Sequence, residues 1–184
     1  QKLLRDAGYL AGSAPETLFS LSKEVQSVGD AFMESVGKPA DAPHVLLHVR
    51  DMSYLPEKAH HSFRCADIRT YRSAIRELVE AGYWVFRIGD ASGPPLEGLP
   101  REVVDVPQHP DYNGALDVYL CARCAFAFNT TSGPYYLVRS FGRPALAVNL
   151  AYDLTRVPHP GDLLLFKDYL DSQTGKRLSY EEIL

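Results

Sequence analysis

Four short apolar runs, separated by stretches with helical spacing, are the feature of this sequence that most restricts its fold. They are HVLLHV starting at His44, YWVFRI at Tyr83, AFAF at Ala125 and ALAVNL at Ala145. Each run is apolar throughout rather than at alternate positions, which is typical of strands covered on both faces. Apolar residues recur at helical spacing in the intervening ranges 67–82, 113–123 and 134–141. This alternation predicts an α/β fold, a Rossmann-like and mostly parallel sheet with helices on both faces.

Two further strands are expected at 103–107 and 163–166, and a short helix at the end of the chain. We expect residues 1–40 to form an amino-terminal helical segment and linker. Within it, Ser13 and Glu16 have the spacing of a capping box, and Gly37 ends the helical pattern. Residues 41–184 are expected to form one Rossmann-like domain.

Charge and cysteine content exclude some classes of function. The formal net charge is -4 and the isoelectric point is about 5.9, which argues against a general nucleic-acid-binding protein. No run of about 18 apolar residues is present, so we expect no membrane-spanning segment. Three cysteines cannot all pair with one another, and a reducing, cytoplasmic location fits them best.

A small, hydroxyl-rich turn follows the third apolar run. Thr130, Thr131, Ser132 and Gly133 lie between a predicted strand and a predicted helix that begins near Pro134. A helix amino terminus has main-chain N–H groups without helical partners and a positive dipole end, and both attract phosphate. The turn therefore predicts a phosphate site, although ordinary helix capping by Ser and Thr would give the same pattern.

Arg50 follows the first apolar run directly, in the sequence His48-Val-Arg50-Asp51. The carboxyl ends of parallel strands line the ligand crevice in this class of fold, so Arg50 is placed to meet a ligand there. A guanidinium fork suits paired phosphate oxygens. His48 is two residues earlier and is expected on the same side. The alternative is an ion pair between Arg50 and Asp51 beside a packed histidine.

Three other residues are candidates for contacts with the sugar or the nucleotide of a donor. Arg64 could add a second cation or lie on the surface, and Arg87 is close to the end of the second apolar run. Asp90 could orient a hydroxyl group or close its loop as an Asx turn. Adjacent His60 and His61 seldom bind one ion together, and no Asp-x-Asp pattern is present, so we expect no metal.

The ordered set HVR, ADI-x-x-Y, LVEAGYWVFRIGD, LDVYLCARCAFAFNTTSG, FGRPALAVN and LSYEEIL resembles a family of bacterial glycosyltransferases of surface-polysaccharide clusters. The resemblance covers roughly residues 44–184. Its layout is similar to the carboxyl-terminal, nucleotide-sugar-binding half of GT-B enzymes, especially fucosyltransferase-like ones with a His-x-Arg element.

This resemblance implies that Arg50 contacts the diphosphate of a nucleotide sugar and that Thr131, Ser132 and Gly133 face the phosphates. His48 and Arg50 would be the catalytic residues, and Asp90 would lie near the donor. No cofactor is implied beyond the nucleotide-sugar substrate. The acceptor would be a glycan or a lipid-linked molecule, met in the cytoplasm or at the inner membrane. Because about 40 residues cannot form a second Rossmann-like domain, a separate acceptor-binding domain is implied.

Two alternatives remain at this point. Sugar-nucleotide 2-epimerases share the layout and have a similar turn, but they usually have acidic residues in the following helix. Here that helix has the sequence YYLVRS, with no acid. The other alternative is a non-catalytic nucleotide-sugar-binding module, or a subunit of a split enzyme.

Overall fold

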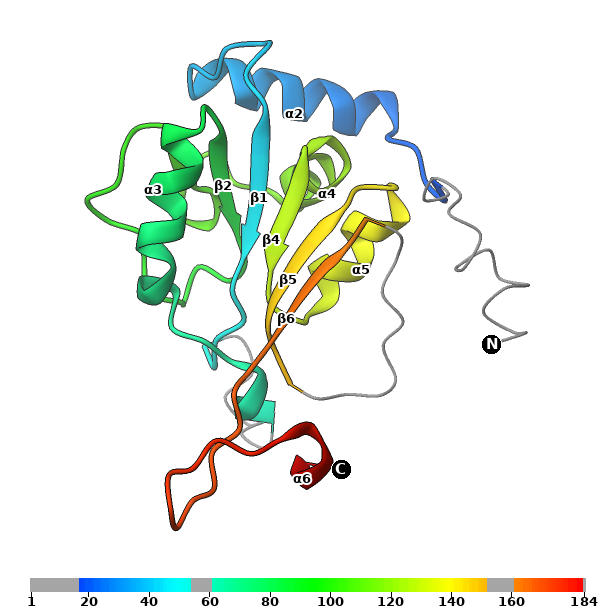
Figure 1. The fold of residues 1–184 in the computed structure, drawn as a ribbon. Coiled ribbons are helices and arrows are strands. Elements are labelled where there is room, and N and C mark those ends of the chain that lie inside the picture. Colours follow the sequence, from blue (N-terminus) through cyan, green and yellow to red (C-terminus); the bar gives the residue numbers. More distant parts are fainter. Residues whose placement is uncertain (1–16, 54–60, 152–160, 184) are drawn as a thin grey trace.

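The computed structural model describes residues 17–53, 61–151 and 161–183 (Figure 1). These residues form a six-stranded sheet in the order β3-β2-β1-β4-β5-β6, and all neighbouring strands are parallel. The strands are β1 (His44–His48), β2 (Trp84–Ile88), β3 (Val103–Asp105), β4 (Phe126–Asn129), β5 (Ala145–Leu150) and β6 (Leu163–Phe166). The predicted α/β fold with a Rossmann-like sheet is confirmed.

Helices cover both faces of this sheet. Side chains from α2, α4 and α5 pack in one cluster, and those of α3 and the 3-10 turn before it pack in the other. The helices are α2 (Lys23–Ser35), α3 (Arg72–Glu80), α4 (Gly114–Arg123), α5 (Gly133–Ser140) and α6 (Tyr180–Ile183), with 3-10 turns at Ile68–Tyr71 and Val106–Gln108.

The apolar strands are explained by these two layers. In β1, Leu46 packs in the cluster of α2, α4 and α5, whereas Val45 and Leu47 pack in the cluster of α3. Successive strand side chains point to opposite faces, so a strand between two helical layers is buried on both sides and is mostly apolar. All five residues of β1 and all five of β2 are buried.

The first described helix begins later than the capping pattern predicted. Residues 17–22 are not helical, and α2 begins at Lys23, where the Ser22 side chain accepts a hydrogen bond from the Val25 N–H. Leu18 and Phe19 instead donate their main-chain N–H groups to Ser140 O at the end of α5. These two bonds fix the segment against the end of α5 in a conformation that is not helical. Ser13 lies outside the described residues.

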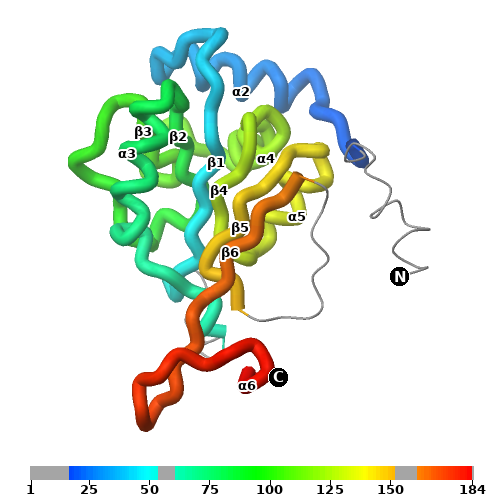
Figure 2. The backbone as a smooth tube through the Cα atoms, viewed as in Figure 1, coloured from blue at the N-terminus to red at the C-terminus, as the bar shows by residue number. Residues whose placement is uncertain are grey.

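The order of the strands reverses between β1 and β4, which lie side by side in the centre of the sheet (Figure 2). The chain moves outward from β1 through β2 to β3, then returns to the other side of β1 to form β4. Ligands of open α/β sheets bind where the strand order reverses, outside the carboxyl ends of the strands. The end of β1 leads to Arg50, and the end of β4 leads to Thr130–Gly133.

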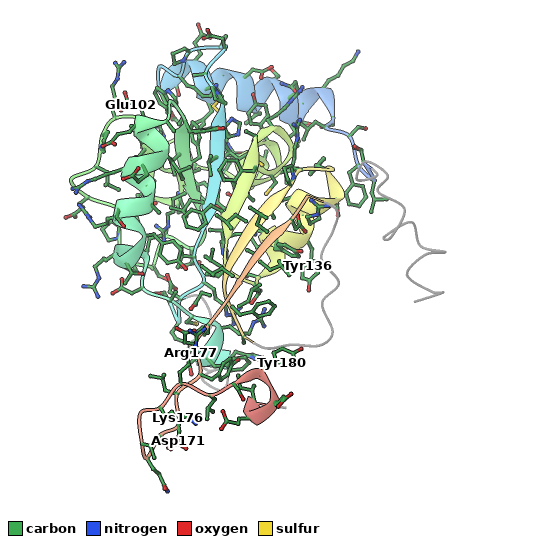
Figure 3. The ribbon with its side chains drawn as sticks, in the orientation of Figure 1. Glu102, Tyr136, Asp171, Lys176, Arg177 and Tyr180 are labelled. Atoms are coloured by element: carbon green, nitrogen blue, oxygen red, sulfur yellow. The ribbon has the colours of Figure 1, made fainter. Side chains whose placement is uncertain are left out.

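After β6 the chain forms an arm, residues 167–183, that extends away from the sheet (Figure 3). Main-chain hydrogen bonds join the two sides of the arm, from the Leu178 N–H to Tyr169 O and from the Asp171 N–H to Lys176 O. Exposed ion pairs of Arg177 with Asp168 and of Lys176 with Glu182 also lie in the arm. Within the described part of the chain, no helix has the length and apolar character needed to cross a membrane.

The contact between α2 and α4 gives a stability prediction. A Cβ added at Gly29 would lie 2.0 Å from the Tyr119 ring, which also donates its hydroxyl to Asp30. We expect Gly29→Ala to reduce the free energy of unfolding by roughly 1–3 kcal/mol, because the ring must move out of a packed site. Urea unfolding measures this. Gly114→Ala is the control, since a Cβ there meets nothing within 4 Å. Equal stability of the two variants would contradict the close packing.

Candidate functional site

A reciprocal pair of hydrogen bonds joins the ends of β1 and β4. The Arg50 N–H donates to Thr130 Oγ1 at 2.7 Å, and the Thr130 N–H donates to His48 O at 2.9 Å. The two segments are 80 residues apart in the sequence. The structure therefore brings Arg50 and the hydroxyl-rich turn to one place, where the strand order reverses.

The turn itself has a buried half and an exposed half. Thr130 and Thr131 are buried, whereas Ser132 is half-buried and Gly133 is exposed. Ser132 is the N-cap of α5, but its side chain makes no capping hydrogen bond. Among the described residues, the main-chain N–H groups of Ser132 and Gly133 also make no hydrogen bond. Capping by Ser132 is therefore not the explanation of this turn, and two N–H groups remain available at the start of α5.

The Arg50 side chain is half-buried, and its Nε is buried without a hydrogen-bond partner in the part of the chain that the structure describes. No ion pair joins it to Asp51 within those residues; Asp51 Oδ1 accepts the Ser53 N–H instead. The alternative of an Arg50–Asp51 ion pair is thus not what the structure has. A buried guanidinium nitrogen without a partner is unfavourable, and an anion would satisfy it.

Arg64 reaches the same turn from the loop before α3. Its Nη2 donates to Thr131 O at 2.7 Å, and the next residues tie the loop to β1, since the Ala66 N–H donates to Arg50 O at 2.9 Å. The guanidinium group therefore lies against the Thr130–Gly133 turn rather than on the open surface. Arg50 and Arg64 add two positive charges beside the positive end of α5.

His48 lies beneath this edge as a buried, neutral imidazole. It is 7% exposed, and its Nδ1 has no hydrogen-bond partner among the described residues. Burial, with a further contribution from the nearby charge of Arg87, lowers the pKa of His48 to about 4. Its predicted catalytic role stays a prediction; what the structure places here is an uncharged side chain below Arg50.

Arg87 and Asp90 take part in other contacts. Arg87 is 2% exposed and forms an ion pair of 2.8 Å with Asp105 at the end of β3. Asp90 accepts hydrogen bonds from the Ser92 N–H and hydroxyl, as in an Asx turn, and these bonds lower the pKa of Asp90. The structure does not bring either residue to the Thr130–Gly133 turn, and their roles at a donor stay predictions.

Asn129, the last residue of β4, was not among the candidate site residues predicted from the sequence. It is 0% exposed, and neither its amide nitrogen nor its amide oxygen has a partner in the described residues. Asn129 pairs with His48 across the two central strands, so their side chains share the face covered by α4 and α5. A polar residue ending an otherwise apolar strand was the available signal. These buried polar atoms mark the same edge as Arg50.

The described residues contain no cluster of three or more His, Cys, Asp or Glu side chains that could hold a metal. The Cys-x-x-Cys pair, Cys121 and Cys124, is buried in the core at the end of α4. Burial raises the pKa of both thiols, that of Cys124 to about 12. Both are therefore protonated, packed side chains. His60 lies outside the described residues.

Comparison with solved structures supports the fold. The chain is similar to a glycosyl transferase of family 9 from Veillonella parvula DSM 2008, with a TM-score of 0.60 and 14% identity. That match covers 90% of this chain and 47% of the other. It is also similar to the E. coli ADP-heptose LPS heptosyltransferase II, with a TM-score of 0.55, 13% identity and coverage of 84% and 46%.

This chain therefore spans less than half the length of these two solved structures. No family model matches the sequence, and no curated protein does. At such low identity the likeness concerns the fold, which is the fold of one part of these glycosyltransferases.

The buried histidines predict acid sensitivity. Burial, with nearby positive charge, also lowers the pKa of His44 to about 4. The unfolded chain binds a proton on each ring near pH 6.5, whereas the folded chain does so only near pH 4, so stability falls as pH falls through this window. We expect a loss on the order of 2 kcal/mol per imidazole between pH 7 and pH 5.

Urea unfolding at both pH values measures this loss. His48→Gln and His44→Gln should each remove about half of the histidine contribution. An unchanged pH dependence in both variants would show that these imidazoles are not responsible.

Proposed function

We propose that this chain is the donor-binding part of a glycosyltransferase that transfers a sugar from a nucleotide sugar to a surface-glycan acceptor. The observation that carries the proposal is the junction of β1 and β4, where Arg50, Arg64 and the open start of α5 meet. The Arg50 Nε is buried without a hydrogen-bond partner among the described residues, and two main-chain N–H groups at the start of α5 make no hydrogen bond there. A diphosphate has the charge and the paired oxygens that this arrangement needs.

The fold supports a sugar-linked diphosphate over other anions. Both matched structures are glycosyltransferases, and the description of the second names ADP-heptose. We therefore take an ADP-sugar as the first donor to test. The sugar, the base and the acceptor are not specified by the residues of this edge. A cytoplasmic location, a lipid-linked or glycan acceptor and a separate acceptor-binding domain remain part of the proposal.

The chemistry follows from the charges. When the bond between the anomeric carbon and the phosphate oxygen breaks, negative charge builds up on the leaving diphosphate. The Arg50 guanidinium and the N–H groups of Ser132 and Gly133 would stabilise that charge without reorganising, which is the most effective form of electrostatic catalysis. In this proposal His48 supports Arg50 from below as a neutral group, and no metal is invoked.

Arg50→Ala is the first test. We expect it to weaken binding of ADP or an ADP-sugar by roughly 1.5–3 kcal/mol, which is about 10- to 150-fold in Kd, because a charged hydrogen-bond donor is lost. Isothermal titration calorimetry with ADP, GDP and UDP measures this. Arg101→Ala, which removes an exposed arginine paired with Glu102, is the control. If the parent chain binds none of the three nucleotides, the proposed function is wrong.

Gly133→Val tests the open start of α5. A Cβ at Gly133 meets nothing within 4 Å, so the variant should fold with nearly the stability of the parent. Its side chain would occupy the space above the free N–H groups, and we expect at least a tenfold loss of nucleotide affinity. Thermal unfolding checks the first expectation and calorimetry the second. A variant that binds as the parent does would remove α5 from the proposed site.

Product analysis distinguishes transfer from epimerisation. With a sugar nucleotide and an acceptor extract, a transferase releases free nucleoside diphosphate. An epimerase forms an isomerised sugar nucleotide without any acceptor. We expect the first result with the longest chain that the gene encodes, and isomerisation without acceptor would contradict the proposal.

A further inference from the structure

Asn149, in β5, has an unusual backbone conformation. Its φ is 55°, and among the described residues it is the only one other than glycine with a positive φ. This left-handed conformation is uncommon for residues with a side chain, and Asn tolerates it better than most. Such a residue persists only where the surrounding structure holds it, and such residues often lie near functional sites.

The conformation accompanies an irregularity in the sheet. The register between β5 and β6 shifts between Ala147 and Leu150. In a regular strand these two side chains would lie on opposite faces, yet both pack in the cluster of α2, α4 and α5. The extra residue of the bulge thus returns Leu150 to the core and releases the Asn149 side chain from the regular alternation of the strand.

The released side chain bonds to the loop of Arg64. Asn149 Nδ2 donates to Cys65 O at 3.1 Å, and Lys167 Nζ lies 3.5 Å from the same oxygen. The residue before Cys65 is Arg64, whose Nη2 contacts Thr131 O, and the residue after it is Ala66, whose N–H contacts Arg50 O. Three consecutive residues are thus fixed to the ends of β4, β5 and β1.

We infer that Asn149 is a positioning residue for Arg64: its amide holds the Arg64 loop so that the guanidinium stays against the phosphate-facing turn. The inference rests on the proposed function for the identity of the ligand, a diphosphate. The hydrogen bond from Asn149 to Cys65 O does not depend on the proposed function. A long arginine side chain loses much conformational freedom when it is held in one place. Because the loop is already fixed in the free protein, part of this conformational entropy is lost before the ligand binds.

A double-mutant cycle separates this role from a general structural one. Asn149→Gly keeps the left-handed backbone without strain and removes the amide. We expect it to weaken binding of ADP and of inorganic pyrophosphate roughly 3- to 10-fold in the parent background. In an Arg64→Ala background it should have no further effect, because the group it positions is absent. A purely structural role would give the same loss in both backgrounds and would overturn the inference.

Two further variants strengthen the cycle. Asn149→Asp keeps the shape and the tolerance of positive φ, but its carboxylate cannot donate to Cys65 O, so it should behave as Asn149→Gly does. Gln108→Ala is the matched control, since it removes a similar amide-to-carbonyl bond, from Gln108 Nε2 to Ala91 O at 2.7 Å. Its effect should add to that of Arg64→Ala. Coupling of Gln108 as strong as that of Asn149 would overturn the inference.

Hydrogen exchange of main-chain amides tests, without any ligand, whether Asn149 holds the Arg64 loop. In Asn149→Gly we expect the Ala66 amide to exchange at least several-fold faster than in the parent, while amides of β1 and β2 stay unchanged. An unchanged Ala66 rate would overturn the inference. If the parent binds neither ADP nor pyrophosphate, the proposed function fails, but the exchange result still decides whether Asn149 holds the Arg64 loop.

Discussion

The hydrogen bond from the Arg50 N–H to Thr130 Oγ1 is the contact on which the rest of this site depends. It joins the ends of the two central strands, and the return bond from the Thr130 N–H to His48 O makes the junction reciprocal. Arg50 and the turn are on separate loops, and this bond holds them together beyond the last paired residues of the two strands, His48 and Asn129. With it, a guanidinium, the start of α5 and the loop of Arg64 share one edge of the sheet.

The positive charge of Arg50 is not compensated within the described residues in the way that the charges of two other buried arginines are. Arg87 and Arg139 are buried, and each is neutralised by an aspartate, Asp105 or Asp162, at 2.8 and 2.9 Å. In each of these pairs the charge of the guanidinium group is compensated by a carboxylate of the protein itself. Arg50 has no such partner among the described residues, although its Nε is buried. That contrast is the strongest physical reason to expect an anionic ligand at this edge.

Some predictions from the sequence held because they depend on local patterns. The apolar runs predicted the strands, and the helical spacing predicted α3, α4 and α5. Gly37, which was expected to end the first helical pattern, adopts a positive φ after the end of α2. The turn at Thr130–Gly133 was recognised from its composition alone. The start of α2 was placed too early, because the main-chain bonds of Leu18 and Phe19 to Ser140 depend on a contact that the local pattern does not contain.

Local periodicity and turn chemistry in the amino-acid sequence were enough to specify the class of the fold and to predict that Arg50 and the Thr130–Gly133 turn follow the ends of strands. Which side chains bond to one another was seen only in the folded structure. Arg87 pairs with Asp105, Arg64 bonds to Thr131 O, and Asn149 leaves the regular strand to reach Cys65. The physical reason is distance along the sequence. Secondary structure depends on neighbours within a few residues, whereas these bonds join segments 18 to 84 residues apart that meet only when the sheet is assembled.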